Sequence, residues 1–417
     1  MRMRLALLAC LAAIAAPYVG SGFSRTSREH SRAPEATAIS AAGRAELSSF
    51  LKSAVDTAGV PGIVALVTGP ERELYIEAVG RSNVADHRPM RADSIFRIAS
   101  MTKPVTTVAA MMLYEQRKLS LDEPVKTYLP DYEQPPVLVS FDRGTGKLET
   151  RPAKRPITIR HLLTHTSGIA YAIDDPVLAA LQQAGRKDSE FPLVHDPGEK
   201  WTYGSNTLLL GRVVEKLAGQ PLDELFRSRV FDVLRMNDTF YTVPGEKLDR
   251  LVTRHQRKGS ALIEIANGAS EASPVRGDGG LSSTASDYGA FVRMLLKGGN
   301  SPGGRLLSVT TVDMMTRDQV APLTVREMPV AMPSIALAFP TGVGHDTFGF
   351  GFQIAARGTS QRSAGSSSWA GVFNTFFWVD PERRIGVVLM MQVLPFFDDA
   401  CKKVVSGFEE RLYRTME

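Results

Sequence analysis

The sequence is poor in cysteine. Its 417 residues include only Cys10 and Cys401, and only Cys401 remains if an N-terminal leader is removed. An exported chain with one cysteine has no internal disulfide, so its fold must be held by its hydrophobic core. A chain of this length, with 43% hydrophobic residues, can bury a core large enough to need no covalent staple.

Several other features are missing. The seven histidines show no His-Glu-x-x-His or similar metal-ligand spacing, so neither a metal nor another cofactor is expected. The net charge is only +5 and the basic residues are scattered, which argues against a nucleic-acid partner. No apolar run approaches the roughly 20 residues that a stable membrane span needs. These absences leave a small molecule as the expected partner.

The N-terminus has the layout of a targeting segment. A basic start at residues 1–4 precedes an apolar stretch at 5–16 and then small residues, which predicts a signal peptide over 1–22 and a flexible polar tail over 23–40. The chain is therefore expected to be exported, to a periplasm or beyond. Lipoprotein anchoring at Cys10 is the less favoured alternative, because the apolar run continues past that cysteine.

The order of predicted elements indicates a mixed α/β (α+β) fold. A helix at 41–58 and strands at 62–68 and 73–79 open the chain, while strands at 375–379 and 385–390 and a helix at 397–414 close it. Between them the patterns are mostly helical. This predicts an α/β domain built from residues 41–110 and 345–417, with a mostly helical domain and inserted loops at 111–344.

One tetrapeptide carries possible chemistry. Ser100-Met101-Thr102-Lys103 stands at the start of a long apolar helix, where residues three apart share a face. A serine hydroxyl is a weak nucleophile unless a base lies beside it, and a lysine desolvated in a cleft loses its proton more readily. Ser-x-x-Lys is also a serine hydrolase signature, although a single match of this kind also arises by chance.

Two further segments add candidates. In the first, Pro197-Gly198 makes a turn and Tyr203 lies on the loop that enters the next helix; a tyrosine beside a cationic lysine could serve as general base. In the second, Trp369-Ala370-Gly371-Val372 precedes a clear strand, and a free N–H there could complete an oxyanion hole with the N–H of Ser100.

Together with Leu162–Gly168 and Gly277–Thr284, these segments appear in an order that resembles the β-lactamase-related serine hydrolases. That family includes class C β-lactamases, DD-peptidases and the family VIII carboxylesterases. The resemblance spans roughly residues 40 to 415 and implies an antiparallel sheet flanked by helices and built from both ends of the chain, plus a helical domain.

The resemblance also implies roles for individual residues. Ser100 would be the acylated nucleophile, Lys103 would take or hold its proton, and Tyr203 would be the partner base. The backbone N–H groups of Ser100 and Val372 would form the oxyanion hole. Trp369 would stand where the lactamases carry the lysine of Lys-Thr-Gly.

Departures from the family pattern favour an esterase. Lactamases usually show Tyr-x-Asn, whereas here Ser205 follows Tyr203 at that spacing and Asn206 comes one residue later. Trp369 offers a flat apolar wall in place of a cation, and Trp369-Ala370-Gly371 is close to the Trp-Gly-Gly of family VIII esterases. Substrate contacts are therefore expected from the set Trp369, Ala370, Gly371, Ser205 and Asn206.

The resulting hypothesis is a serine carboxylesterase that acts on short-chain esters through an acyl-enzyme. A weak β-lactamase activity is compatible with this hypothesis. Two alternatives stay open: a β-lactamase, DD-peptidase or amidase of the same fold, and an acyltransferase in which an alcohol replaces water.

Three other features of the sequence are not assigned a catalytic role. Gly299-Asn300-Ser301-Pro302-Gly303 fits the Gly-x-Ser-x-Gly pattern but lacks the required strand and helix, so Ser301 is interpreted as a turn residue. His165 has no acidic partner along the sequence and is interpreted as structural. The segment 328–345 is either a loop over the substrate pocket or a surface insertion.

Overall fold

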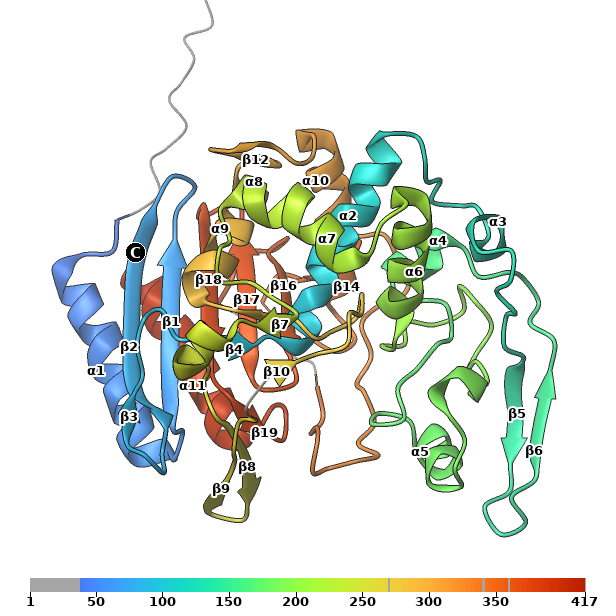
Figure 1. Ribbon diagram of the computed structural model, residues 1–417, viewed down its shortest axis with the longest axis horizontal. Helices are drawn as coiled ribbons and strands as arrows, with labels where there is room; N and C mark the ends of the chain where they lie inside the picture. Colours follow the sequence, from blue (N-terminus) through green and yellow to red (C-terminus); the bar gives the residue numbers. More distant parts are fainter. Residues whose placement is uncertain (1–37, 269–270, 340–341, 359–360, 417) are drawn as a thin grey trace, which may run out of the picture. The chain divides into compact units, whose positions relative to one another are not determined.

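The computed structural model describes residues 38–416 apart from 269–270, 340–341 and 359–360 (Figure 1). The predicted signal peptide, Cys10 and most of the predicted tail lie outside the described residues. The described residues all belong to one compact unit. The proposed division of the chain at residues 110 and 344 stays a prediction.

The helices open and close where the sequence supplies caps. Ser40 accepts a hydrogen bond from the N–H of Gly43, and Gly59, in the left-handed region, follows the last residue of the first helix. The α-helices are α1 Ala41–Ala58, α2 Thr102–Glu115, α3 Val125–Tyr128, α4 Ile159–Leu163, α5 Pro176–Gln183, α6 Asn206–Ala218, α7 Leu222–Phe226, α8 Asp232–Leu234, α9 Ala285–Leu296, α10 Val309–Met315 and α11 Asp399–Arg414. Shorter turns are η1 Ala99–Met101, η2 Asp188–Glu190, the π-helical η3 Arg227–Phe231 and η4 Gly245–Arg250.

Strands from both ends of the chain form the main antiparallel sheet. In spatial order the strands are β14 Thr347–Phe348, β15 Gln353–Ile354, β16 Ser367–Gly371, β17 Thr375–Asp380, β18 Ile385–Met390, β1 Gly62–Thr68, β2 Glu73–Asn83 and β3 Arg88–Pro89. The first strand of the chain, β1, therefore pairs with β18 near its end, from Val64 opposite Met390 to Thr68 opposite Gly386.

Smaller ribbons lie outside the main sheet. They are β4 Phe96–Arg97 with β11 Ser282–Ser283, β5 Val137–Phe141 with β6 Leu148–Arg151, β7 Thr242–Val243 with β10 Glu271–Ala272, β8 Arg254–Lys258 with β9 Ala261–Ile265 and β19 Val393–Leu394, and β12 Asn300–Ser301 with β13 Gly304–Arg305. Ser301 is the last residue of β12, next to the turn of this hairpin and not at a strand-to-helix junction, so the Gly-x-Ser-x-Gly match does not form a nucleophile elbow.

Helices cover both faces of the main sheet. α1 and α11 pack together on one face, and α9 crosses β1, β17 and β18 on the other (Figure 1). Every residue of β1 and of β18 is buried, which explains why these strands read as unbroken apolar runs instead of alternating ones. The predicted fold class, an antiparallel sheet built from both termini with flanking helices, is confirmed.

The structure describes the surroundings of Cys401 and shows whether any helix could span a membrane. Cys401 is fully buried near the start of α11, and burial raises the pKa of its thiol well above the ordinary value, with Asp398 adding to the rise. It is a packing residue. None of the helices among the described residues is both long and apolar enough to cross a membrane.

Candidate active site

The Ser100 segment is a tight turn between a strand and a buried helix. β4 ends at Arg97, η1 carries Ser100, and α2 begins at Thr102. Ala99 has φ +44°, a region that costs a non-glycine residue free energy and that tends to occur at functional sites. The turn is held from outside because the N–H of Ile98 donates to the carbonyl of Leu281 at 2.9 Å.

The end of β16 lies directly against this turn. A Cβ atom added at Gly371 would come within 2.2 Å of the carbonyl oxygen of Ile98, so no larger residue fits at this position without a shift of the backbone. β16 also carries Trp369 and Ala370, both buried. Glycine at 371 therefore allows the strand with the predicted substrate contacts to approach the turn that carries Ser100, the predicted nucleophile.

Lys103 is buried inside a set of three oxygen atoms. Its side chain is almost wholly buried, with 1% of the residue exposed. Its Nζ atom lies 3.1 Å from Ser100 Oγ, 3.1 Å from the Tyr171 hydroxyl and 2.7 Å from the backbone carbonyl of Asp278. The predicted proximity of Ser100 and Lys103 is confirmed, since the two side chains are in hydrogen-bond contact.

Tyr171 and Asp278 form the other side of this network. The Tyr171 hydroxyl donates to Asp278 Oδ2 at 2.6 Å, and Arg276 contacts both oxygens of the same carboxylate at 2.9 and 3.0 Å. Burial raises the pKa of Tyr171 well above its ordinary value, and the charge of Asp278 adds to the rise. Burial alone would raise the pKa of Asp278, but Lys103, Arg276 and Tyr171 together lower it. Tyr171 is thus held as a neutral phenol beside a carboxylate.

The network fixes the direction of the Lys103 hydrogen bonds. The Asp278 carbonyl can only accept, and Tyr171 uses its own proton on the Asp278 carboxylate, so both must accept from Lys103. A protonated Lys103 also donates to Ser100. A neutral Lys103 has only two N–H groups, and its lone pair then faces the Ser100 hydroxyl. The geometry therefore allows Lys103 to receive the Ser100 proton.

Tyr203 stands between Lys103 and Trp369. Its ring centre lies 4.9 Å from Lys103 Nζ and 4.9 Å from the centre of the Trp369 ring system. The rings of Tyr171 and His165 also pack on it, at 5.4 and 4.9 Å. Its hydroxyl makes no hydrogen bond within the described part of the chain. In contrast to the hydroxyl of Tyr171, the hydroxyl of Tyr203 is therefore not held by a neighbouring side chain of the described residues, and its predicted role as a base stays a prediction.

The two predicted oxyanion donors lie on the segments that Gly371 brings together. Val372 follows β16 and is half-buried, and Ser100 is half-buried in η1. Neither backbone N–H donates to another residue among those the structure describes. Two unused donors beside a nucleophile suit a developing oxyanion, and this assignment stays a prediction.

Asn206 does not reach the open part of the site. It is fully buried at the start of α6; its amide nitrogen contacts His165 Nδ1 at 2.9 Å and the Ile169 carbonyl at 3.4 Å. Its amide oxygen accepts from the Ser167 hydroxyl. The structure thus corrects the prediction that Asn206 contacts substrate, because displacement by one residue turns this amide into the protein interior.

Ser205, by contrast, faces open space. It lines a cavity of about 560 Å³ next to Tyr171, together with Arg212 and Arg276. Its predicted role in substrate binding remains a prediction.

His165 is structural, as interpreted from the sequence. Burial lowers the pKa of its imidazole well below the ordinary value, and the Lys103 charge adds to this effect. Its ring packs on those of Trp201, Tyr203, Phe348 and Trp369. The neutral ring thus packs among aromatic side chains, and within the described residues no acidic side chain forms a hydrogen bond with it.

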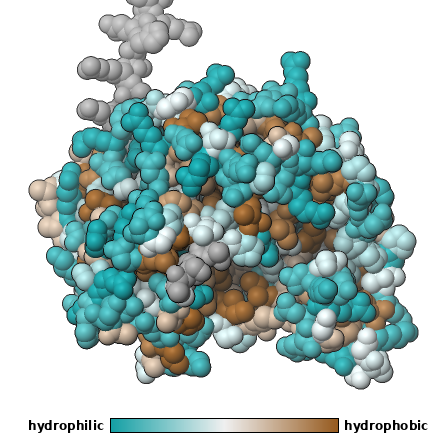
Figure 2. Space-filling view, in the orientation of Figure 1, coloured by the Kyte–Doolittle hydropathy of each residue, from teal (hydrophilic) through white to brown (hydrophobic). Residues whose placement is uncertain are grey.

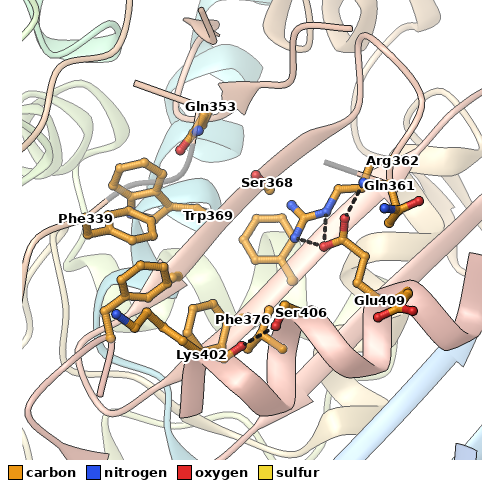
Figure 3. Close-up of a pocket in the computed structure, with 15 residues that line it drawn as sticks. Phe339, Gln353, Gln361, Arg362, Ser368, Trp369, Phe376, Lys402, Ser406 and Glu409 are labelled. Atoms are coloured by element: carbon orange, nitrogen blue, oxygen red, sulfur yellow. Dashed lines mark hydrogen bonds and ion pairs between the residues drawn. The ribbon is translucent and has the colours of Figure 1, made fainter. Parts of the chain in front are cut away.

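A second cavity, of about 450 Å³, begins at Trp369. Figure 3 shows the rings of Trp369 and Phe339 side by side at one end, while Lys402, Ser406 and Glu409 of α11 run along the cavity. Phe339 lies in the segment 328–345, so this segment contributes a wall of a cavity beside the site. Figure 2 shows hydrophobic surface gathered in the hollow between the part of the molecule that contains the main sheet and the part with α5 and β5–β6.

Sequence reasoning missed the partners of Lys103. Tyr171 lies three residues after the Leu162–Gly168 segment, and Asp278 lies inside Gly277–Thr284; both segments were noted without a role for these side chains. Arg276, which holds Asp278, was also missed. A tyrosine close to a recognised segment was the available signal. In the described part of the chain, no group of three or more His, Cys, Asp or Glu residues could hold a metal ion.

Comparisons with known proteins give matches over most of this chain. A family profile described as Beta-lactamase matches residues 47–405. Monacolin J acid methylbutanoyltransferase of Aspergillus terreus is 29% identical, over 88% of this chain and 95% of its own length. Lovastatin esterase of Penicillium rubens is also 29% identical, over 88% and 98%. A solved simvastatin synthase variant from Aspergillus terreus superposes with a TM-score of 0.79 at 27% identity, over 91% of this chain and 98% of that one.

Proposed function

Because the chain belongs to the β-lactamase family, we propose that it is a serine carboxylesterase that cleaves short-chain carboxylic esters through an acyl-enzyme on Ser100. The observation that carries the proposal is the contact of 3.1 Å between Lys103 Nζ and Ser100 Oγ. The apolar Trp369, at the position of the lactamase lysine, supports an uncharged ester in preference to a β-lactam carboxylate.

The proposed reaction has two steps. Ser100 Oγ attacks the ester carbonyl carbon and its proton passes to Lys103, while the N–H groups of Ser100 and Val372 bind the oxyanion. The carbon–oxygen bond to the alcohol then breaks, and the alcohol leaves with a proton delivered through Tyr203. Water attacks the acyl-enzyme by the reverse route and releases the acid and Ser100.

Acyl transfer is the second candidate. The same acyl-enzyme yields a new ester when an alcohol attacks it in place of water, and relatives of this chain include a protein named as a transferase and one named as an esterase. The two outcomes differ in what enters the site after acylation, not in the residues that form the acyl-enzyme.

The first prediction concerns Ser100→Ala with p-nitrophenyl butyrate as substrate. We expect kcat/KM to fall by about three orders of magnitude or more, because no other group can form the acyl-enzyme. Ser301→Ala is the matched control: Ser301 lies in the β12–β13 hairpin, and its replacement should leave the rate unchanged. Full activity in Ser100→Ala would disprove the nucleophile.

Two product measurements decide between the candidates. The ratio of butyric acid to butyl butyrate formed in the presence of 1-butanol separates hydrolysis from transfer. Rapid turnover of a chromogenic cephalosporin with negligible ester cleavage would overturn the esterase proposal in favour of a β-lactamase.

We further propose that the segment 1–22 directs export. The observation behind this proposal is the sequence pattern described above, and N-terminal sequencing of protein recovered from outside the cytoplasm tests it.

A further inference from the structure

The cavity beyond Trp369 is open because its neighbouring strand is short. β15 pairs with β16 only at Ser367 and Ser368, so the edge of β16 from Trp369 to Gly371 has no strand beside it. In place of a strand, Phe339 and Phe397 pack against each other at 5.0 Å and Phe339 packs on Trp369 at 5.8 Å. The cavity thus extends to the edge of β16 where Trp369 lies.

The exposed wall of this cavity is mostly apolar, with uncharged polar side chains from Gln353, Gln361, Ser368 and Ser406 among the rings. Its rings and aliphatic side chains come from β16, β17 and α11, and from two residues outside these elements, Phe339 and Phe397. The residues from the three elements are Trp369, Phe376, Phe377 and Val405. A volume of about 450 Å³ lies within the range of small-molecule sites in proteins. Such a lining favours an apolar group, since burial of apolar surface is the main favourable term.

The charged residues of the cavity are already paired. Arg362 contacts Glu409 at 2.8 Å, as the dashed lines in Figure 3 show. Lys402 contacts Asp399 at 2.6 Å, and Glu410 contacts Arg414 at 3.9 Å. A charged ligand would have to displace one of these contacts or remain uncompensated. The cavity therefore suits an uncharged molecule.

The position of Tyr203 indicates which part of an ester enters. Tyr203 stands between Lys103 and Trp369, and a proton donor must lie within hydrogen-bond reach of the oxygen that it protonates. The ester oxygen that receives this proton belongs to the alcohol. The alcohol part of the substrate therefore starts beside Trp369 and continues toward the cavity.

We infer that this cavity binds the alcohol part of the substrate and selects a bulky, uncharged, apolar alcohol. The inference rests on the proposed function, in which Ser100 carries the acyl group. In acyl transfer the same cavity would hold the acceptor alcohol before it attacks.

The test changes the alcohol and the acyl group separately. Methyl butyrate is compared with 2-naphthylmethyl butyrate, which enlarges the alcohol, and with methyl 2-naphthylacetate, which enlarges the acyl group. For the unchanged protein we expect kcat/KM for 2-naphthylmethyl butyrate to exceed that for methyl butyrate by about tenfold or more, the scale of discrimination by a hydrophobic pocket.

Ser406→Trp fills the cavity from α11, where Ser406 is exposed and its replacement leaves the core intact. We expect the preference for the naphthylmethyl alcohol to be lost, while the ratio between the two methyl esters stays as in the unchanged protein. Lys403→Trp is the matched control, since Lys403 is an exposed residue of the same helix outside the cavity. A change in the ratio between the two methyl esters with the alcohol preference kept, or no change in either ratio, would overturn the inference.

A binding measurement separates this inference from the proposed function. Calorimetry with 2-naphthylmethanol on the full chain requires no turnover, and we expect binding that Ser406→Trp weakens by about tenfold. Binding without ester cleavage would support the cavity and reject the esterase. Ester cleavage without binding, or binding that Ser406→Trp leaves unchanged, would support the esterase and reject the cavity.

Discussion

The surroundings of Lys103 and the cavity beyond Trp369 meet at Tyr203, yet they are built from different interactions. Around Lys103, polar atoms are paired at 2.6 to 3.1 Å and their protons have fixed directions. Beyond Trp369, the walls are mostly rings and aliphatic side chains with a few uncharged polar groups, and each charged side chain of the lining has an ion-pair partner. Under the proposed function, the reaction would depend on a few hydrogen bonds of fixed geometry, whereas the choice of substrate would depend on the shape of the cavity.

The largest expected effect after loss of Ser100 is that of Tyr203→Phe, because Tyr203 contacts Lys103 on one side and Trp369, which lines the cavity, on the other. The change removes the hydroxyl and keeps the ring that packs on Trp369. We expect kcat to fall by about two orders of magnitude, the usual scale for a general acid or base. The preference between small and bulky alcohols should survive in the remaining activity.

The measurement for Tyr203→Phe is steady-state hydrolysis of butyrate esters with different alcohols. Unchanged kcat would exclude a proton-transfer role for Tyr203. If kcat stays unchanged but the preference for the bulky alcohol is lost, Tyr203 contributes to binding of the alcohol and not to proton transfer.

A smaller effect is expected from Tyr171→Phe, which disturbs only the polar region. The variant removes one acceptor from Lys103 and the hydrogen bond to the Asp278 carboxylate. We expect about a tenfold loss in kcat with little change in KM, since Tyr171 acts through Lys103 and not on the substrate.

The pH dependence of the rate distinguishes a positioning role for Tyr171 from general damage. The pH profile of kcat/KM should shift in Tyr171→Phe, because the hydrogen bonds of Lys103 change. Tyr75→Phe is the control, since the Tyr75 hydroxyl contacts Ser48 on α1. An unshifted profile with a lower rate would assign Tyr171 a purely structural part.

The smallest effect concerns stability and not rate. Asp174 is 9% exposed, and its Oδ2 atom has no hydrogen-bond partner among the described residues. Burial raises the pKa of its carboxyl to about 7, with Lys103 opposing the rise and Asp175 adding to it. Between the ordinary pKa of 3.8 and about 7 the folded chain binds more protons than the unfolded chain, so stability falls as pH rises through this window.

We therefore expect Asp174→Asn to stabilise the protein above pH ~7 and to change little near pH ~4, where the carboxyl is neutral in the folded state. Each unit of pKa difference corresponds to about 1.4 kcal/mol, so the gain is a few kcal/mol at most. Thermal unfolding at several pH values measures it. A gain that does not vary with pH would show that ionisation of Asp174 is not its cause.

Much of the fold could be read from local patterns. The helix expected at 41–58 and the strand expected at 62–68 match α1 and β1, because a serine cap, a glycine end and an unbroken apolar run are local signals. Short strands were harder to place. β15 covers only Gln353–Ile354, since its pairing with β16 lasts for only two residues, too few for an alternating pattern to reveal it.

The sequence predicted only part of the geometry of the candidate site. Ser100 and Lys103 are one helical turn apart, so their contact follows from their spacing. The outcome for Asn206 did not follow from spacing, because the direction of an amide at a helix start depends on what packs against it. Here His165 and the Ser167 hydroxyl, some 40 positions earlier, bind this amide in the interior.

The sequence by itself determined the fold class and the proximity of Ser100 and Lys103, and it predicted Ser100 as nucleophile and Trp369 as a substrate contact, because each depends on near neighbours or on motif order. Only the tertiary structure decided which oxygens bind Lys103 and where a substrate can extend. The Lys103 partners come from 68 and 175 positions away, and the cavity arises where a short strand leaves the edge of β16 uncovered. Contacts between distant segments form only when the whole chain packs.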